Sequence, residues 1–302
     1  MQLLTIRTFG ETDVRVDGRS VKWRSDSARV LFFYLLSHPD GRTRDQIIET
    51  LWHTDPDFAV SGRFRVVVYR LRAALQRRSA VLEDRSHYRL EPEVLAACDA
   101  QRFTELLAQA EHAADLDAKR GLYELALELN QGDYLPDETA DWVSEIRAQY
   151  RTASAHALLE LSRLHHERGD CAASMNALER ALALDPLTGE DHHQQLMLCL
   201  STVRGKYAAV EYYRRYVDFL RTDLGDTPML ETTALAGRIK DNIAPCICPT
   251  VQRLLNGESL HVNEPGCYNA LRFETHVETE RSLSIASTAP LTTITAPLVT
   301  RA

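Results

Sequence analysis

The 302-residue chain lacks the features that mark membrane and secreted proteins. No run of about 18 consecutive apolar residues occurs, so no membrane-spanning helix or membrane partner is predicted. Residues 1–7 contain no basic stretch leading into a long hydrophobic run, so no secretory signal is predicted and we expect a cytoplasmic protein. The six cysteines are scattered along the chain, which favours reduced thiols over a disulfide framework.

Sequence motifs of three common enzyme classes are also missing. The chain has no G-x-x-x-x-G-K-[ST] phosphate loop, no G-x-S-x-G nucleophile turn and no H-E-x-x-H zinc motif. Two pairs of adjacent histidines lie at 165–166 and 192–193, but neighbouring side chains on a helix point in different directions and do not easily share a metal. We therefore predict no enzyme, no cofactor and no metal.

The most informative shortage is that of acidic side chains between residues 59 and 78. The chain carries a formal charge of −8, yet this stretch has six arginines and no Asp or Glu. Residues 1–95 hold 16 Lys and Arg against 13 Asp and Glu, a balance of +3 that leaves −11 for residues 96–302. Because cations that neutralise phosphates provide most nonspecific affinity for nucleic acids, the first part suits DNA and the second suits protein partners.

The arginine-rich stretch has the periodicity of a helix with one apolar face. The positions that would form a buried stripe are Phe64, Val68, Leu71 and Leu75. The side chains that would point away from it are Arg65, Val66, Tyr69 and Arg70. Arginine suits such a face because its planar fork pairs with guanine edges or clamps phosphate. A basic run by itself is also compatible with a helix face that is only solvated and binds nothing. For Tyr69, a position at the edge of the core is as compatible with the pattern as a contact with DNA.

Residues 1–95 have the element order of a small mixed domain. Alternating apolar residues predict short strands at 4–6, 14–16 and 21–23, with a tight turn at Asp17-Gly18. A helix over 28–36 is followed by a second over 44–52, whose predicted capping box is Thr43 to Gln46. Trp52 would complete the apolar face of that second helix and plug the core. After the arginine helix, residues 81–90 form a predicted hairpin with its polar tip at 83–86.

This order resembles the OmpR-type winged helix-turn-helix of SARP/AfsR-type bacterial regulators. The segments that carry the resemblance are Val16–Arg19, Arg44–Ile48, Leu51-Trp52, Phe64–Val66, Leu71–Leu75 and Tyr88–Leu90. In that family the third helix enters the major groove and the hairpin, or wing, approaches the adjacent minor groove. The DNA-binding residues that the resemblance implies are Arg63, Arg65, Val66, Tyr69, Arg70, Arg72, Arg85 and His87. Among them, Arg72 would contact a flanking phosphate. At the wing, this chain has Ser86-His87 before Tyr88, where the family often has one or two glycines.

The second part of the chain is predicted to be helical. Apolar residues follow helical periods, with breaks near 132–136, 169–170, 185–186 and 205–206. Residues 158–186 fit a tetratricopeptide unit, in which small residues let two antiparallel helices approach closely. A looser copy runs from Gly205 to Pro228.

This part is similar to the bacterial transcriptional activator domain that follows the winged helix in SARP-type regulators. The matching segments are Asp99–Phe103, Gly132–Leu135, Trp142, Asp185–Leu187 with Glu190, and Asp223–Gly225 before Pro228. The resemblance implies packing against the DNA-binding domain and self-association. It also implies that the chain binds promoter DNA as a homodimer and contacts RNA polymerase.

The expected fold is mostly α with a small β component. It comprises a winged helix-turn-helix domain (1–95), a tetratricopeptide-like activator domain (96–245) and a partly disordered tail (246–302). In the tail, three cysteines and His261 could be drawn as a zinc site, but their spacing is not that of a standard finger and reduced thiols are favoured.

The leading functional hypothesis is a sequence-specific transcriptional regulator, an activator that binds promoter repeats through the arginine-rich helix and wing. The alternative is a tetratricopeptide-type adaptor that does not bind DNA. An enzyme with an unrecognised site is a more remote third class.

Overall fold

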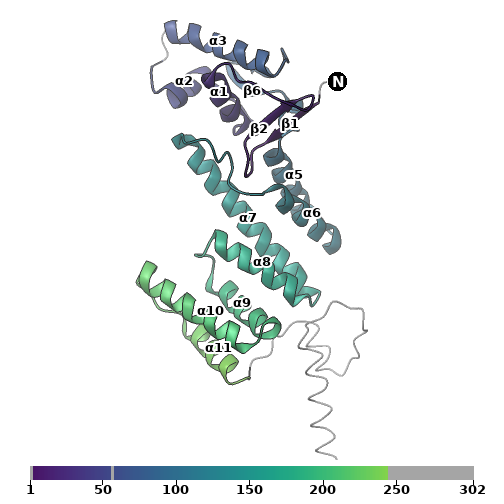
Figure 1. The fold of residues 1–302 in the computed structure, drawn as a ribbon, viewed down its shortest axis with the longest axis vertical. Coiled ribbons are helices and arrows are strands. Elements are labelled where there is room, and N and C mark those ends of the chain that lie inside the picture. Colours follow the sequence, from purple (N-terminus) through teal and green to yellow (C-terminus); the bar gives the residue numbers. More distant parts are fainter. Residues whose placement is uncertain (1–2, 56–57, 244–302) are drawn as a thin grey trace, which may run out of the picture. The chain divides into compact units, whose positions relative to one another are not determined.

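The computed structural model describes residues 3–55 and 58–243 (Figure 1). These residues fall into two compact units. Of the described residues, the first unit contains 3–55, 58–161 and 180–187, and the second contains 162–179 and 188–243. No helix in the described part of the chain is long and apolar enough to cross a bilayer. The predicted tail, with its cysteines and His261, lies outside the described residues.

The chain opens with a small antiparallel sheet in the first unit. Its strands β1 (Leu4–Arg7), β2 (Asp13–Val16) and β3 (Arg19–Ser20) lie in that order. Asp17 and Gly18 take φ of 49° and 77°, as a two-residue hairpin turn requires. The predicted hairpin is confirmed, but its third strand ends at Ser20 and does not include 21–23. The Trp23 ring instead packs on the rings of Phe32 and Phe33, with centroids 5.4 and 6.4 Å away.

Three helices and a hairpin complete the winged-helix arrangement. They are α1 (Asp26–Leu36), β4 (Arg42–Thr43), α2 (Arg44–Trp52), α3 (Phe58–Ala74), β5 (Val81–Asp84) and β6 (His87–Leu90). The predicted capping box of α2 is confirmed, because Thr43 Oγ1 accepts from the Gln46 amide while Gln46 Oε1 accepts from the Thr43 amide. Strand β6 lies between β4 and β5, so the wing is anchored to the start of α2.

The described residues from 92 onwards are mostly helical, as the sequence predicts. The helices are α4 (Pro92–Leu95), α5 (Asp99–His112), α6 (Leu116–Leu129), α7 (Asp141–Glu167), α8 (Cys171–Leu184), α9 (Glu190–Val203), α10 (Lys206–Phe219), the π-helical turn η1 (Leu220–Leu224) and α11 (Leu230–Lys240). All four predicted breaks fall between helices. Cys98, Cys171 and Cys199 are buried, and burial raises the pKa of the Cys98 thiol to about 12.

Small polar side chains hold the second unit together at close range. Ser162 and Ser174 share a hydrogen bond of 2.9 Å between their hydroxyls where α7 and α8 pack. Buried His193 of α9 places Nδ1 2.7 Å from the Tyr212 hydroxyl of α10. The His193 ring also stacks on Tyr216, with centroids 4.0 Å apart.

In the first unit, the N-terminal sheet is joined to the helical region through Asp99 at the start of α5. The Asp99 carboxylate accepts from the Thr8 amide at 2.8 and 3.0 Å, from the Thr8 hydroxyl at 2.5 Å and from the Phe9 amide at 3.2 Å. Thr8 is completely buried. These donors have no access to water there, so the carboxylate is needed to satisfy them.

An aromatic cluster extends this junction. The Phe9 ring meets Phe103 of α5, Tyr134 and Tyr150 of α7 edge to face, with centroids 5.1 to 5.9 Å apart. The Tyr134 hydroxyl is 2.8 Å from the Ser37 hydroxyl at the end of α1. Residues of the sheet, α1, α5 and α7 therefore share one hydrophobic core.

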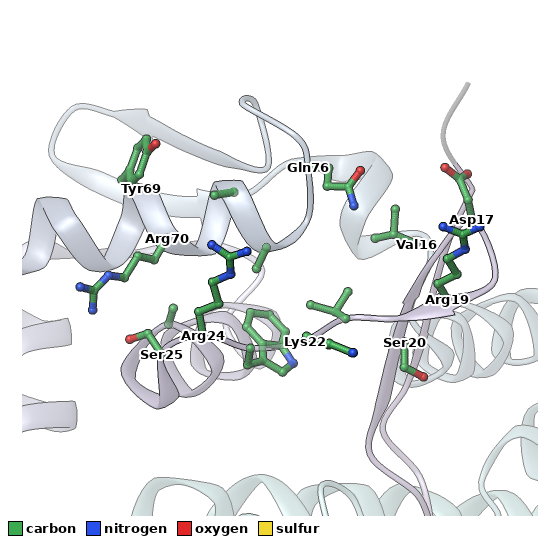
Figure 2. Close-up of a pocket in the computed structure, with 15 residues that line it drawn as sticks. Val16, Asp17, Arg19, Ser20, Lys22, Arg24, Ser25, Tyr69, Arg70 and Gln76 are labelled. Atoms are coloured by element: carbon green, nitrogen blue, oxygen red, sulfur yellow. The ribbon is translucent and has the colours of Figure 1, made fainter.

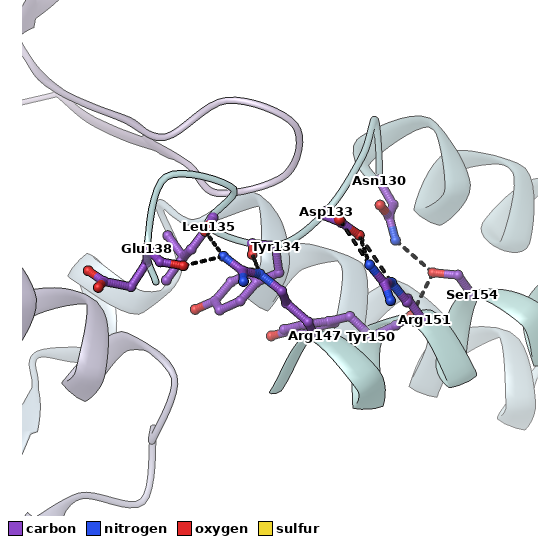
Figure 3. Close-up of polar contacts among 9 residues, drawn as sticks. All are labelled: Asn130, Asp133, Tyr134, Leu135, Glu138, Arg147, Tyr150, Arg151 and Ser154. Atoms are coloured by element: carbon purple, nitrogen blue, oxygen red, sulfur yellow. Dashed lines mark hydrogen bonds and ion pairs between the residues drawn. The ribbon is translucent and has the colours of Figure 1, made fainter. Parts of the chain in front are cut away.

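Two arginines of α7 hold the loop that carries Tyr134 (Figure 3). The Arg147 guanidinium donates to the carbonyls of Tyr134, Leu135 and Glu138. Arg151 pairs with both carboxylate oxygens of Asp133 at 2.9 Å. Because several donors converge on this short loop, its position against Phe9 is well determined.

Asp99→Ala is expected to lower the free energy of unfolding by about 2–4 kcal/mol, because buried donors on Thr8 and Phe9 lose their acceptor. Urea unfolding monitored by circular dichroism measures the change. Asp133→Ala is the matched control: its ion pair with Arg151 is about half exposed on both sides, so the loss should stay below about 1 kcal/mol. Superimposable curves for the two variants would contradict the central role of Asp99.

Candidate nucleic-acid interface

The side of α3 that faces away from the core carries the residues predicted to read DNA. The predicted stripe of Phe64, Val68, Leu71 and Leu75 is buried, and Val67 widens it. On the opposite side Val66 is 47% exposed and Tyr69 is 71% exposed. The exposure of Tyr69 argues against the core-capping alternative, because a side chain that capped the core edge would be largely covered, and its contact with DNA stays a prediction.

The exposed face has an uncharged centre and two cationic edges. Successive residues of a helix are rotated by about 100°, which places Gly62, Val66, Tyr69 and Ala73 in the middle. Arg65 and Arg72 lie along the edge near the wing. The opposite edge holds Arg63 and Arg70, and Arg70 lines a cleft towards the N-terminal sheet (Figure 2).

Aromatic contacts fix how α3 lies on the domain. The Phe64 ring meets Tyr88 of β6 edge to face at 4.8 Å and Trp52 of α2 at 6.3 Å. Trp52 is half-buried and packs against the core, which confirms its predicted structural role. Its ring is also covered by the Arg63 guanidinium at 4.8 Å, so part of the Arg63 side chain is committed to holding α2 and α3 together.

Arg72 has a structural partner that the sequence did not reveal. It is half-buried, and its Nη2 donates to the Val81 carbonyl of β5 at 2.6 Å. This bond ties the C-terminal half of α3 to the wing. The phosphate contact of Arg72 stays a prediction, and the side chain would have to make it while also donating to the Val81 carbonyl.

The wing has a tighter tip than the sequence predicts. Strand β5 continues to Asp84, so only Arg85 and Ser86 form the turn, with φ of 47° and 68°. The left-handed region costs a non-glycine residue about 1–2 kcal/mol, which explains why glycine is common here in the related family. Arg85 and His87 are exposed, and His87 Nδ1 lies 3.3 Å from the Arg85 carbonyl.

Some arginines near this surface form ion pairs with carboxylates and others do not. Arg77 pairs with Glu91 at 2.5 Å and is structural. Arg65, Arg70 and Arg85 are exposed and form no ion pair with any residue in the ranges that the structure covers. Exposed cations on one surface that form no ion pairs attract the negative charges of a phosphate backbone.

Sequence reasoning missed a further group of cations next to α3. Arg19, Lys22 and Arg24 line the same cleft as Arg70. They lie outside any helix, so the periodicity that singled out α3 does not apply to them. Within the described ranges, no cluster of His, Cys, Asp or Glu suits a metal ion.

The comparisons with known proteins concern both parts of the chain. Residues 98–240 match the family model of the bacterial transcriptional activator domain. No curated protein matches the sequence significantly. The solved structure of Mycobacterium tuberculosis EmbR, in complex with a low-affinity phosphopeptide, is similar in fold with a TM-score of 0.65 and 20% identity, over 92% of this chain and 72% of that chain. The chain therefore carries a match to an activator domain behind a winged-helix fold.

Proposed function

We propose that the chain is a sequence-specific DNA-binding activator that reads promoter DNA with the exposed face of α3 and with the wing. The observation that carries this proposal is the face itself: an uncharged centre bordered by arginines that have no carboxylate partner among the described residues. An α-helix of this kind fits the major groove, which is about 12 Å wide.

Each part of the face suits a different feature of the groove. Arg65 and Arg70 are long enough to reach base edges, where the arginine fork pairs with the two acceptors of guanine. Val66 is exposed at the centre, where an apolar group contacts the methyl group of thymine. Arg85 and His87 at the wing tip would contact the backbone or the neighbouring minor groove.

The proposal assigns separate tasks to the two parts of the chain. Residues 1–95 would bind promoter DNA, and residues 96–245, with their acidic surplus, would contact a second copy of the chain and RNA polymerase. The protein would then be associated with the nucleoid. Because the activator domain shares a core with the winged helix in the first unit, a partner held by α5 or α6 would lie at a defined position relative to α3.

A mobility-shift titration against genomic fragments at several salt concentrations tests DNA binding. The expected result is a preferred fragment and an affinity that falls steeply with salt, because bound cations displace counterions from the duplex. An adaptor without DNA binding would show neither a preferred fragment nor a steep salt slope.

Arg70→Ala is expected to weaken binding to the preferred fragment by about 1–3 kcal/mol more than binding to random duplex, because a base contact is lost. Competition titrations of the two DNAs measure this difference, with circular dichroism to confirm the fold. If both affinities fell by the same factor, Arg70 would be a phosphate contact and not a reader of bases.

Arg72→Ala should behave differently. Loss of its bond to the Val81 carbonyl is expected to reduce the free energy of unfolding by about 1–2 kcal/mol, and loss of a flanking cation should weaken specific and random DNA alike. Urea unfolding and the same competition titration report the two effects. The control is Arg78→Ala, an exposed cation with no ion pair to the described residues, for which stability should not change.

Two copies are expected on neighbouring half-sites arranged as direct repeats, because one helix in one groove offers few base contacts. Half-sites about 10–10.5 base pairs apart place both helices on one face of the duplex. Inserting about five base pairs should abolish cooperative binding, and inserting about ten should partly restore it. A footprint over a single half-site, unaffected by either insertion, would count against a dimer on DNA.

A further inference from the structure

A cleft of about 1130 Å³ lies along the C-terminal half of α3 (Figure 2). One wall is formed by α3, including Tyr69 and Arg70, and the other by the chain between β2 and the start of α1. The second wall contributes three cations, which are Arg19, Lys22 and Arg24. Figure 2 shows Arg24 reaching from this segment towards α3, next to Arg70.

The charge of this cleft is almost entirely positive. Asp17 is the single acidic residue among those that line it, and its Oδ1 already accepts a hydrogen bond of 2.9 Å from the Leu3 amide. In the described part of the chain, no ion pair is formed by Arg19, Lys22 or Arg24. Like charges gathered without a counter-charge repel one another, so an anion in the cleft would stabilise the arrangement.

The packing of Trp23 explains why these cations face outwards. The Val21 amide donates to the Val14 carbonyl at 2.8 Å, and Trp23 lies on the rings of Phe32 and Phe33. In an extended segment, alternate side chains point to opposite sides. Lys22 and Arg24 therefore lie on the solvent side, where both are exposed.

We propose that Lys22 and Arg24, with Arg19 further along the cleft, bind backbone phosphates of the duplex whose major groove receives α3. This inference rests on the proposed function. A groove that holds a helix has a phosphate backbone on each side. The wing lies along one edge of α3, and the Lys22–Arg24 segment lies along the other, so the two elements would hold the two backbones.

The form of the cleft favours DNA over a small anionic ligand. Pockets for small molecules are mostly apolar and enclose most of the ligand surface. Here the cations are exposed side chains on two walls of an open cleft, Arg70 on α3 and the other three on the segment opposite, and such a spread of charge suits the repeated phosphates of a backbone. Contacts to phosphates position the protein and carry no direct sequence information.

The test uses the full chain and a fluorescent random-sequence duplex of about 30 base pairs, titrated by fluorescence anisotropy at several salt concentrations. Each neutralised phosphate contributes about 0.9 to the slope of log K against log salt. The double variant Lys22→Ala/Arg24→Ala should therefore make the slope shallower by about 1.8. If the affinities are equal at 1 M salt, this change corresponds to roughly a 60-fold loss of affinity at 0.1 M salt. Specific and random DNA should be affected equally.

The matched control is Arg7→Ala/Arg15→Ala. It removes the same charge from the neighbouring N-terminal sheet, but Arg7 is paired with Glu11 and Arg15 with Asp13, and neither lines the cleft. Its slope should stay near that of the natural sequence. Melting curves establish that both double variants are folded.

The outcomes separate this inference from the proposed function. A slope for Lys22→Ala/Arg24→Ala equal to that of the control would overturn the phosphate contact, even if Arg70→Ala still reduced specific binding. A larger loss on the preferred fragment than on random duplex would overturn it too, because these residues would then read bases. If the natural sequence bound no duplex at all, both the inference and the proposed function would be wrong.

Discussion

The hydrogen bonds between the Asp99 carboxylate and the buried donors of Thr8 and Phe9 are the contact on which the first unit depends. A buried amide without an acceptor costs free energy comparable to a lost hydrogen bond, so the chain after β1 can follow this path only with α5 in place. Close backbone contact adds a second constraint: a Cβ on Gly132 would lie 3.0 Å from the Gly10 Cα. The winged helix and the first activator helices are therefore joined by specific contacts within one folded unit.

Several of the residues that make the second part similar to an activator domain lie at this junction. Asp99 binds Thr8, Phe103 and Tyr134 pack on Phe9, and Trp142 meets Tyr34 of α1 edge to face at 5.4 Å. These positions are among those that carry the resemblance to an activator domain. These side chains therefore dock against the N-terminal domain as well as belonging to the helical part of the chain.

Local patterns predicted the parts of the fold that local physics determines. Helical spacing identified the stripe of α3, and the Thr43–Gln46 pair identified the start of α2. The same patterns could not show which elements meet. Trp23 leaves the predicted strand because its ring packs on Phe32 and Phe33 of α1, and Arg72 binds the Val81 carbonyl of a strand that comes later in the chain. Both outcomes follow from tertiary contacts, which periodicity does not encode.

Helix α1 connects the junction to the face of α3. Seven of its eleven residues are buried, as expected for a helix with neighbours on several sides, and one of those neighbours is α3. Towards the activator domain, Arg29 is 3.3 Å from the Glu138 carboxylate, and Ser37 holds the Tyr134 hydroxyl. A shift of the loop at 134–138 would displace α1, and closely packed side chains would pass that displacement to α3. Contacts made by the activator helices are thus mechanically connected to the surface proposed to read DNA.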